Sequence, residues 1–107
     1  MSPEVLAADL HAAPGGGRVY VSNRGAVNSI ATFDTTVPHR PELIGEAPSG
    51  GTWPRHFAVT PDGGYLVVAN EHSGRLTALA IGADGLVAAP VASAEAPGVS
   101  YVEIHDA

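Results

Sequence analysis

The sequence predicts an all-β fold built from two copies of one repeat. The stretch 10–25 returns in altered form as 57–70. Identical residues recur 47 positions apart, among them Pro14 and Pro61, Gly16 and Gly63, Val21 and Val68, and Asn23 and Asn70. Each copy reads as strand, Pro/Gly turn and strand, and no segment sustains an apolar period of 3.6 residues. A repeat of this length is typical of β-propeller blades, so the chain is predicted to be a partial propeller.

The first predicted blade covers residues 6–47. Its strands are expected at 6–13, 18–23, 28–34 and 42–47. In the second of these strands Val19 and Val21 share one face among β-forming residues, which is typical of a sheet. Two prolines in the segment 35–41 indicate a loop, and the short strand that follows it is expected at the sheet edge.

The second predicted blade covers residues 55–93. Its strands are expected at 55–60, 65–70, 75–81 and 85–93, and a final strand is expected within 98–105. The tightest turn is Thr60-Pro61-Asp62-Gly63. Proline there presets φ, aspartate binds its own backbone, and glycine adopts a left-handed conformation, so a hairpin is predicted.

Composition limits the class of protein. The chain has 107 residues, 45% of them hydrophobic, which argues against disorder. Two repeats are fewer than the three or so that a stacked architecture needs, so we expect the chain to be incomplete. The formal net charge is −6 and all five basic residues are arginines, which disfavours nucleic acid as a partner.

Compartment and membrane predictions follow from the same sequence. Cysteine is absent, which excludes disulfides and thiolate metal sites. The first residues lack the charged and apolar segments of a signal peptide. The apolar run 76–92 is interrupted at 82–85, so a membrane-spanning helix is not expected. We expect a soluble, cytoplasmic chain without a membrane partner.

Several motifs together resemble one family. In chain order they are 8–11, the Pro-Gly-Gly turn, 19–25, 28–30, 50–57 and 61–70. Their order and spacing resemble the lactonase family of seven-bladed propellers, which includes bacterial 6-phosphogluconolactonase and fungal carboxymuconate cyclase. The resemblance implies that this sequence is the C-terminal two blades plus a closing strand, which a truncated gene model, a shortened expressed fragment or a broken gene would each give. It implies hydrolysis of a sugar lactone or a related lactone-forming reaction, and it implies contact with the remaining blades or self-association.

Two arginines depart from the repeat. Arg24 has Glu71 as its equivalent and Arg55 aligns with Ala8, so the blade itself does not require either guanidinium. Arginines near strand ends are suited to holding a carboxylate or phosphate and to stabilising the oxyanion of an opening lactone. The alternative is that each is a surface arginine paired with an acid.

Asp9 and His11 are the other candidate catalytic residues. They lie two positions apart on a predicted strand and therefore on one face. His11 is suited to act as general base on a water, with Asp9 orienting it or contacting the substrate. The family pattern usually carries glutamate where this chain has Asp9. The alternative for His11 is a structural role on the inner face.

The remaining polar motifs predict no further chemistry. His56 faces away from Arg55 along its strand, His72 lies in a polar turn, and Trp53 either lines the site or packs between blades. No histidine pair has metal-site spacing, so we expect no metal and no cofactor. The glycines at 15–17 are read as a turn, not as a phosphate loop. A second functional hypothesis is a non-catalytic propeller repeat that acts as a binding or scaffold module.

Overall fold

A computed structural model describes residues 5–37, 39–99 and 101–102 of the chain. The described part contains eight strands and no helix. In chain order they are β1 (Val5–Ala12), β2 (Arg18–Gly25), β3 (Ser29–Asp34), β4 (Glu42–Pro48), β5 (Pro54–Val59), β6 (Tyr65–Asn70), β7 (Arg75–Ile81) and β8 (Val87–Glu95). Within these residues, therefore, no helix is long and apolar enough to cross a membrane.

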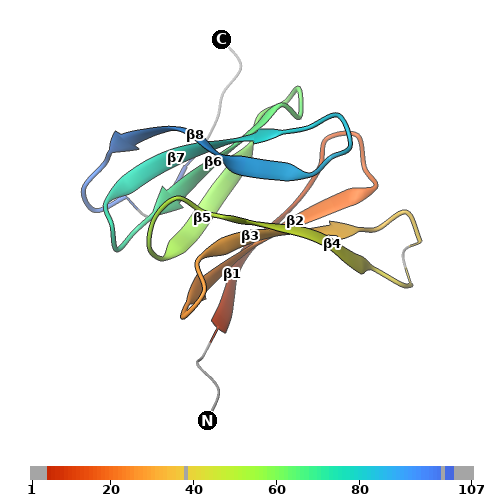
Figure 1. The fold of residues 1–107 in the computed structure, drawn as a ribbon, viewed down its shortest axis with the longest axis horizontal. Coiled ribbons are helices and arrows are strands. Elements are labelled where there is room, and N and C mark those ends of the chain that lie inside the picture. Colours follow the sequence, from red (N-terminus) through yellow and green to blue (C-terminus); the bar gives the residue numbers. More distant parts are fainter. Residues whose placement is uncertain (1–4, 38, 100, 103–107) are drawn as a thin grey trace.

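The strands form two antiparallel four-stranded sheets (Figure 1). The first has the order β1-β2-β3-β4 and the second the order β5-β6-β7-β8. This confirms the predicted all-β fold of two four-stranded units, and the strand bounds differ from those predicted by at most two residues. The final strand predicted within 98–105 falls partly outside the described residues, and residues 98, 99, 101 and 102 are not in a strand.

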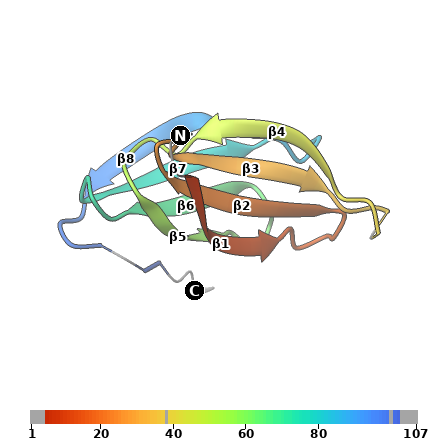
Figure 2. The ribbon, with the colours of Figure 1, turned by 90° about the horizontal axis from the view of Figure 1, so that it is seen from below.

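The two sheets pack face to face as neighbouring blades (Figure 2). Strand β1 contacts β5 at one edge, and β4 contacts β8 at the other. The first strands of the two blades therefore lie side by side, and so do their last strands. One apolar cluster joins both sheets. Its buried members are Tyr20, Ile30, Ala47, Phe57, Leu66, Val68 and Leu79.

The face of the sheet that is buried in the second blade is the opposite of the face that is buried in the first. Leu66 is fully buried in the second blade, whereas its equivalent Val19 is only half-buried in the first. The contrast is larger on the first strands, where Phe57 is 0% exposed and its equivalent Leu10 is 61% exposed. Each blade therefore has two apolar faces, of which the neighbouring blade covers one.

The predicted hairpin turns are confirmed. The φ angle is 77° at Gly16 and 73° at Gly63, and both angles lie in the left-handed region that glycine adopts without the steric cost of a side chain. In the second turn the N–H of Gly63 donates to the carbonyl of Thr60 at 2.8 Å. The side chain of Thr60 and the N–H of Gly64 both donate to Asp62, and these hydrogen bonds hold the pKa of that carboxyl below its ordinary value.

The linker between the blades runs from β4 to β5 and is packed against the second blade. The hydroxyl of Thr77 donates to the carbonyl of Ser49, and the N–H of Thr52 donates to Ser73 Oγ at 3.0 Å. A Cβ added at Gly51 would lie 2.6 Å from atoms of Asn70 and of Ser73. The linker therefore requires glycine at this position for steric reasons.

We predict that Gly51→Ala lowers the free energy of unfolding by about 1–3 kcal/mol, because the added methyl group overpacks the contact with buried Asn70. Chemical denaturation measures the change. Gly15→Ala is the matched control, since no atom lies within 4 Å of a Cβ built there. Equal stability of the two variants would contradict the packing of this linker.

Candidate functional site

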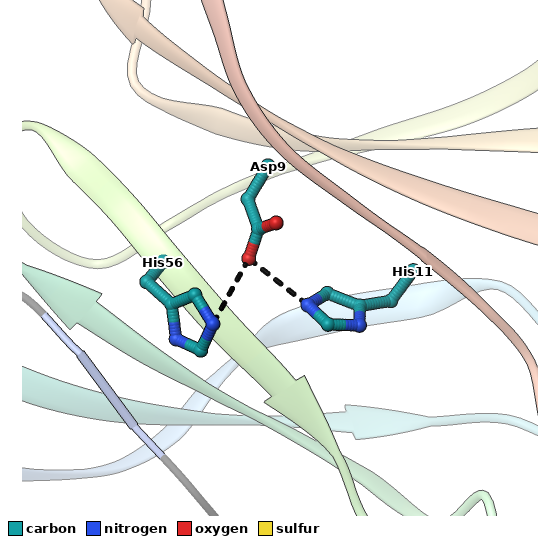
Figure 3. A group of neighbouring side chains, drawn as sticks. All are labelled: Asp9, His11 and His56. Carbon is teal, nitrogen blue, oxygen red and sulfur yellow. Dashed lines mark hydrogen bonds and ion pairs between the residues drawn. The ribbon is translucent and has the colours of Figure 1, made fainter.

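Asp9, His11 and His56 meet where the first strands of the two blades lie side by side (Figure 3). Nε2 of His11 lies 2.9 Å from Oδ2 of Asp9, and Nε2 of His56 lies 3.4 Å from the same oxygen. The N–H of Phe57 also donates to this oxygen, at 3.3 Å. One carboxylate thus receives polar contacts from β1 and from β5, and it links the two blades.

Matching irregularities in β1 and β5 aim these side chains. The pairing register shifts between Ala7 and Asp9 in β1, and between Pro54 and His56 in β5. Such bulges leave one residue unpaired and turn the neighbouring side chains. Since Asp9 and His56 are one repeat apart, the same local device places them at equivalent positions in adjacent blades.

The hydrogen bonds of His56 define its protonation pattern. The N–H of Val102 donates to Nδ1 of His56 at 3.0 Å, so this nitrogen is an acceptor. A neutral imidazole with an acceptor at Nδ1 carries its proton on Nε2, the nitrogen that faces Asp9. The ring of Tyr101 stacks on His56 with centroids 4.2 Å apart.

His11 is held by its hydrogen bond to Asp9 and by an aromatic contact. Its ring meets the ring of Phe57 edge-on, with centroids 4.8 Å apart. Nε2 of His11 is engaged by the carboxylate, and Nδ1 takes no part in the hydrogen bonds among the described residues. The imidazole is therefore oriented through one nitrogen and has a basic lone pair at the other.

A hollow of about 300 Å³ adjoins this cluster. It is lined by His11, Ala12, Pro14, His56, Ala58, Val59, Tyr101 and Val102. A larger hollow, of about 610 Å³, lies among the hairpin turns and contains none of the predicted site residues. We take the smaller hollow as the candidate site, because of these two it alone is lined by histidines, which can exchange a proton near neutral pH.

A second group contains both predicted arginines. The guanidinium carbon of Arg24 lies 4.9 Å from the ring centroid of Trp53, and Trp53 stacks on His72 at 4.5 Å. Glu71 continues the group, with one carboxylate oxygen 3.9 Å from His72 and the other 3.2 Å from NH1 of Arg55.

Trp53 is the only described non-glycine residue with a positive φ, at 67°. Such a conformation costs a bulky residue on the order of 1–3 kcal/mol and persists only where the surroundings impose it. Nε of Arg24 is buried and has no hydrogen-bond partner among the described residues. The strained backbone of Trp53 and the unbonded Nε of Arg24 therefore lie in the same stack of side chains.

The structure brings the predicted site residues together as two groups. Asp9 and His11 form the expected pair, and Arg24 and Arg55 belong to the stack around Trp53. No hydrogen bond or ion pair within the described ranges joins either arginine to Asp9 or His11. The groups adjoin along β5, where Arg55 directly precedes His56. The catalytic roles assigned to these four residues stay predictions.

Sequence reasoning gave His56 too little weight. Spacing along one strand relates only residues of that strand, whereas His56 reaches Asp9 from the neighbouring blade. The repeat contained the missing signal, because Asp9 and His56 lie 47 residues apart and so occupy the same position in successive blades. Tyr101 was likewise not singled out as a site residue.

The same cluster contains three side chains of the kinds that bind metal ions, one carboxylate and two imidazoles. Donor atoms of Asp9, His11 and His56 all lie within 4.8 Å of one another. Coordination through Nε2 of His56 would place the imidazole proton on Nδ1, opposite the N–H of Val102, so that two donors would face each other. The observed bonding therefore favours a hydrogen-bonded group over metal coordination.

Two antiparallel blades that pack face to face, with polar side chains meeting on their first strands, define this chain as part of a β-propeller. A family model described as lactonase, 7-bladed beta-propeller, matches residues 2–104. The chain belongs to this lactonase family.

Two curated relatives are named 6-phosphogluconolactonase. That of Formosa agariphila is 41% identical over 71 residues, which cover 64% of this chain and 20% of the relative. That of Bacillus subtilis is 39% identical over 69 residues, which cover 63% of this chain and 19% of the relative. The chain thus spans about a fifth of the length of these relatives.

A solved structure supports the same relationship. The periplasmic gluconolactonase of Pseudomonas aeruginosa matches with a TM-score of 0.85 and 30% identity, over 92% of this chain and 28% of that one. The fold of the two blades is therefore that of a segment of a larger propeller.

We predict that the Val102 amide and Nδ1 of His56 show a scalar coupling across their hydrogen bond in NMR spectra of the labelled chain. His56→Phe should remove the coupling, retain stacking on Tyr101 and lower stability by about 1 kcal/mol, because the amide loses its acceptor. A wild-type spectrum in which Nδ1 carries the proton would contradict this arrangement.

Proposed function

We propose that this chain supplies part of the active site of a hydrolase that opens a sugar lactone of the 6-phosphogluconolactone type. The observation that carries the proposal is the 2.9 Å contact between Asp9 and His11 beside a hollow. The names of the relatives, which are 6-phosphogluconolactonases and a gluconolactonase, support the substrate class.

In this proposal His11 is the general base. Its Nδ1 accepts a proton from water while the water oxygen bonds to the lactone carbonyl carbon, and Asp9 stabilises the resulting imidazolium. The tetrahedral intermediate carries the negative charge on the former carbonyl oxygen. Its collapse breaks the ring C–O bond, the His11 imidazolium gives its proton to the ring oxygen, and the product is a hydroxy acid.

The arginines supply positive charge in the same proposal. Guanidinium groups bind carboxylates and phosphates through paired hydrogen bonds and stabilise an oxyanion. Arg55 is paired with Glu71 and its side chain is 56% exposed, so a ligand anion would compete with that carboxylate. Further blades are the proposed partners, because two blades provide only one wall of a propeller pocket.

A chimera tests the proposed function. This chain replaces the matching segment of the Bacillus subtilis 6-phosphogluconolactonase, and opening of 6-phosphogluconolactone is measured. We predict that the chimera is active and that Arg24→Ala and Arg55→Ala each remove about 2–4 kcal/mol of transition-state stabilisation.

Arg40→Ala in the same chimera is the matched control, because Arg40 is exposed and belongs to neither group. Its kcat/KM should equal that of the parent chimera. An inactive but folded chimera would instead favour a binding or scaffold role, and unchanged rates in both arginine variants would remove their proposed roles.

The isolated chain is predicted to self-associate and to show no turnover above spontaneous lactone opening. Both free blade faces are apolar, and Leu10 on one of them is 61% exposed. Leu10→Lys should shift the chain toward the monomer in analytical ultracentrifugation. Val27→Lys, at a turn residue that is 44% exposed, should not. A monomeric wild-type chain with clear turnover would contradict this prediction.

A further inference from the structure

Trp53 is held by both blades at once. Its N–H donates to Oδ1 of Asn28 at 2.9 Å, and its carbonyl accepts from the N–H of Glu71 at 2.9 Å. Asn28 is itself fixed, because its Nδ2 donates to the carbonyl of Gly25 at 3.2 Å. The left-handed backbone of Trp53 is thus imposed from two sides, and the position of the indole ring follows from it.

The indole ring in turn limits where Arg24 can lie. The guanidinium packs over the ring at 4.9 Å, and its Nε is buried. Arginine stacks on aromatic faces while the edge of its planar group stays available for hydrogen bonds. The ring therefore leaves the terminal NH groups of Arg24 as the donors that a ligand can reach.

We infer that Trp53 is a positioning residue that presents Arg24 to an anionic group, a carboxylate or a phosphate, of the bound sugar acid or lactone. The inference rests on the proposed function, because it specifies how one of the proposed anion-binding arginines is oriented. It assigns to Trp53 no contact with the reacting atoms.

Trp53 also provides the probe, since it is the only tryptophan in the chain. The chain is titrated separately with gluconate, inorganic phosphate and 6-phosphogluconate while Trp53 fluorescence and the Nε–H NMR signal of Arg24 are followed. We expect 6-phosphogluconate to change both signals, and the other two anions identify which group binds. Arg24→Lys should abolish the fluorescence response, and Arg40→Lys should leave it intact.

Two substitutions separate positioning from stability. Trp53→Gly should keep or raise the unfolding midpoint, because glycine adopts the left-handed conformation freely, yet it should weaken anion binding about tenfold, as loss of the cation–π contact implies. Trp53→Phe, which keeps an aromatic face, should bind with intermediate affinity. Both variants are followed by calorimetry and by the Arg24 signal.

Unchanged anion affinity and an unchanged Arg24 signal in Trp53→Gly would overturn the inference, as would a wild-type chain that binds none of the three anions. The proposed function is judged separately by the chimera. An active chimera whose KM is unaffected by Trp53→Gly retains the function and rejects the inference. An inactive chimera, combined with anion binding that depends on Trp53, rejects the function and retains the anion site.

Discussion

Each blade of this chain has two apolar faces, and the fold depends on covering them. The first blade covers Phe57, Leu66 and Val68 of the second, which are all fully buried. Burial of one such side chain contributes about 1.5–3 kcal/mol, so this interface is a main source of stability. Leu10, the equivalent of Phe57 in the first blade, is exposed because no blade precedes it among the described residues. Packing in series explains why one sequence pattern is buried in one copy and exposed in the other.

The same serial packing creates the site. Residues one repeat apart occupy equivalent positions, so Asp9 and His56 meet where β1 and β5 lie side by side. A similar hydrogen bond forms one repeat later. His56 accepts from the N–H of Val102, as Asp9 accepts from the N–H of Phe57. Side chains at this position therefore link successive first strands. The residue type at this position changes from aspartate to histidine between the blades, while the backbone geometry stays the same. A carboxylate and an imidazole are thereby brought into contact.

The sequence was sufficient to predict the strands and the pairing of Asp9 with His11, because both depend on local patterns. Alternation, turn residues and the 47-residue period act over short distances or repeat regularly. The contact of His56 with Asp9 was not predicted, since it depends on how far two bulged strands approach each other. The stack of Arg24, Trp53 and His72 was not predicted either, because it forms only where the end of β2, the linker between the blades and the turn after β6 converge.

The least favourable local geometry lies at the junction between blades. Trp53 adopts a conformation that costs on the order of 1–3 kcal/mol, and the hydrogen bonds that impose it come from Asn28 of one blade and Glu71 of the other. A glycine would satisfy the same backbone geometry without that cost. The blades alone therefore do not explain a tryptophan here. The ring is accounted for by its contacts with the guanidinium of Arg24 and the imidazole of His72, and the repeat does not require the arginine either.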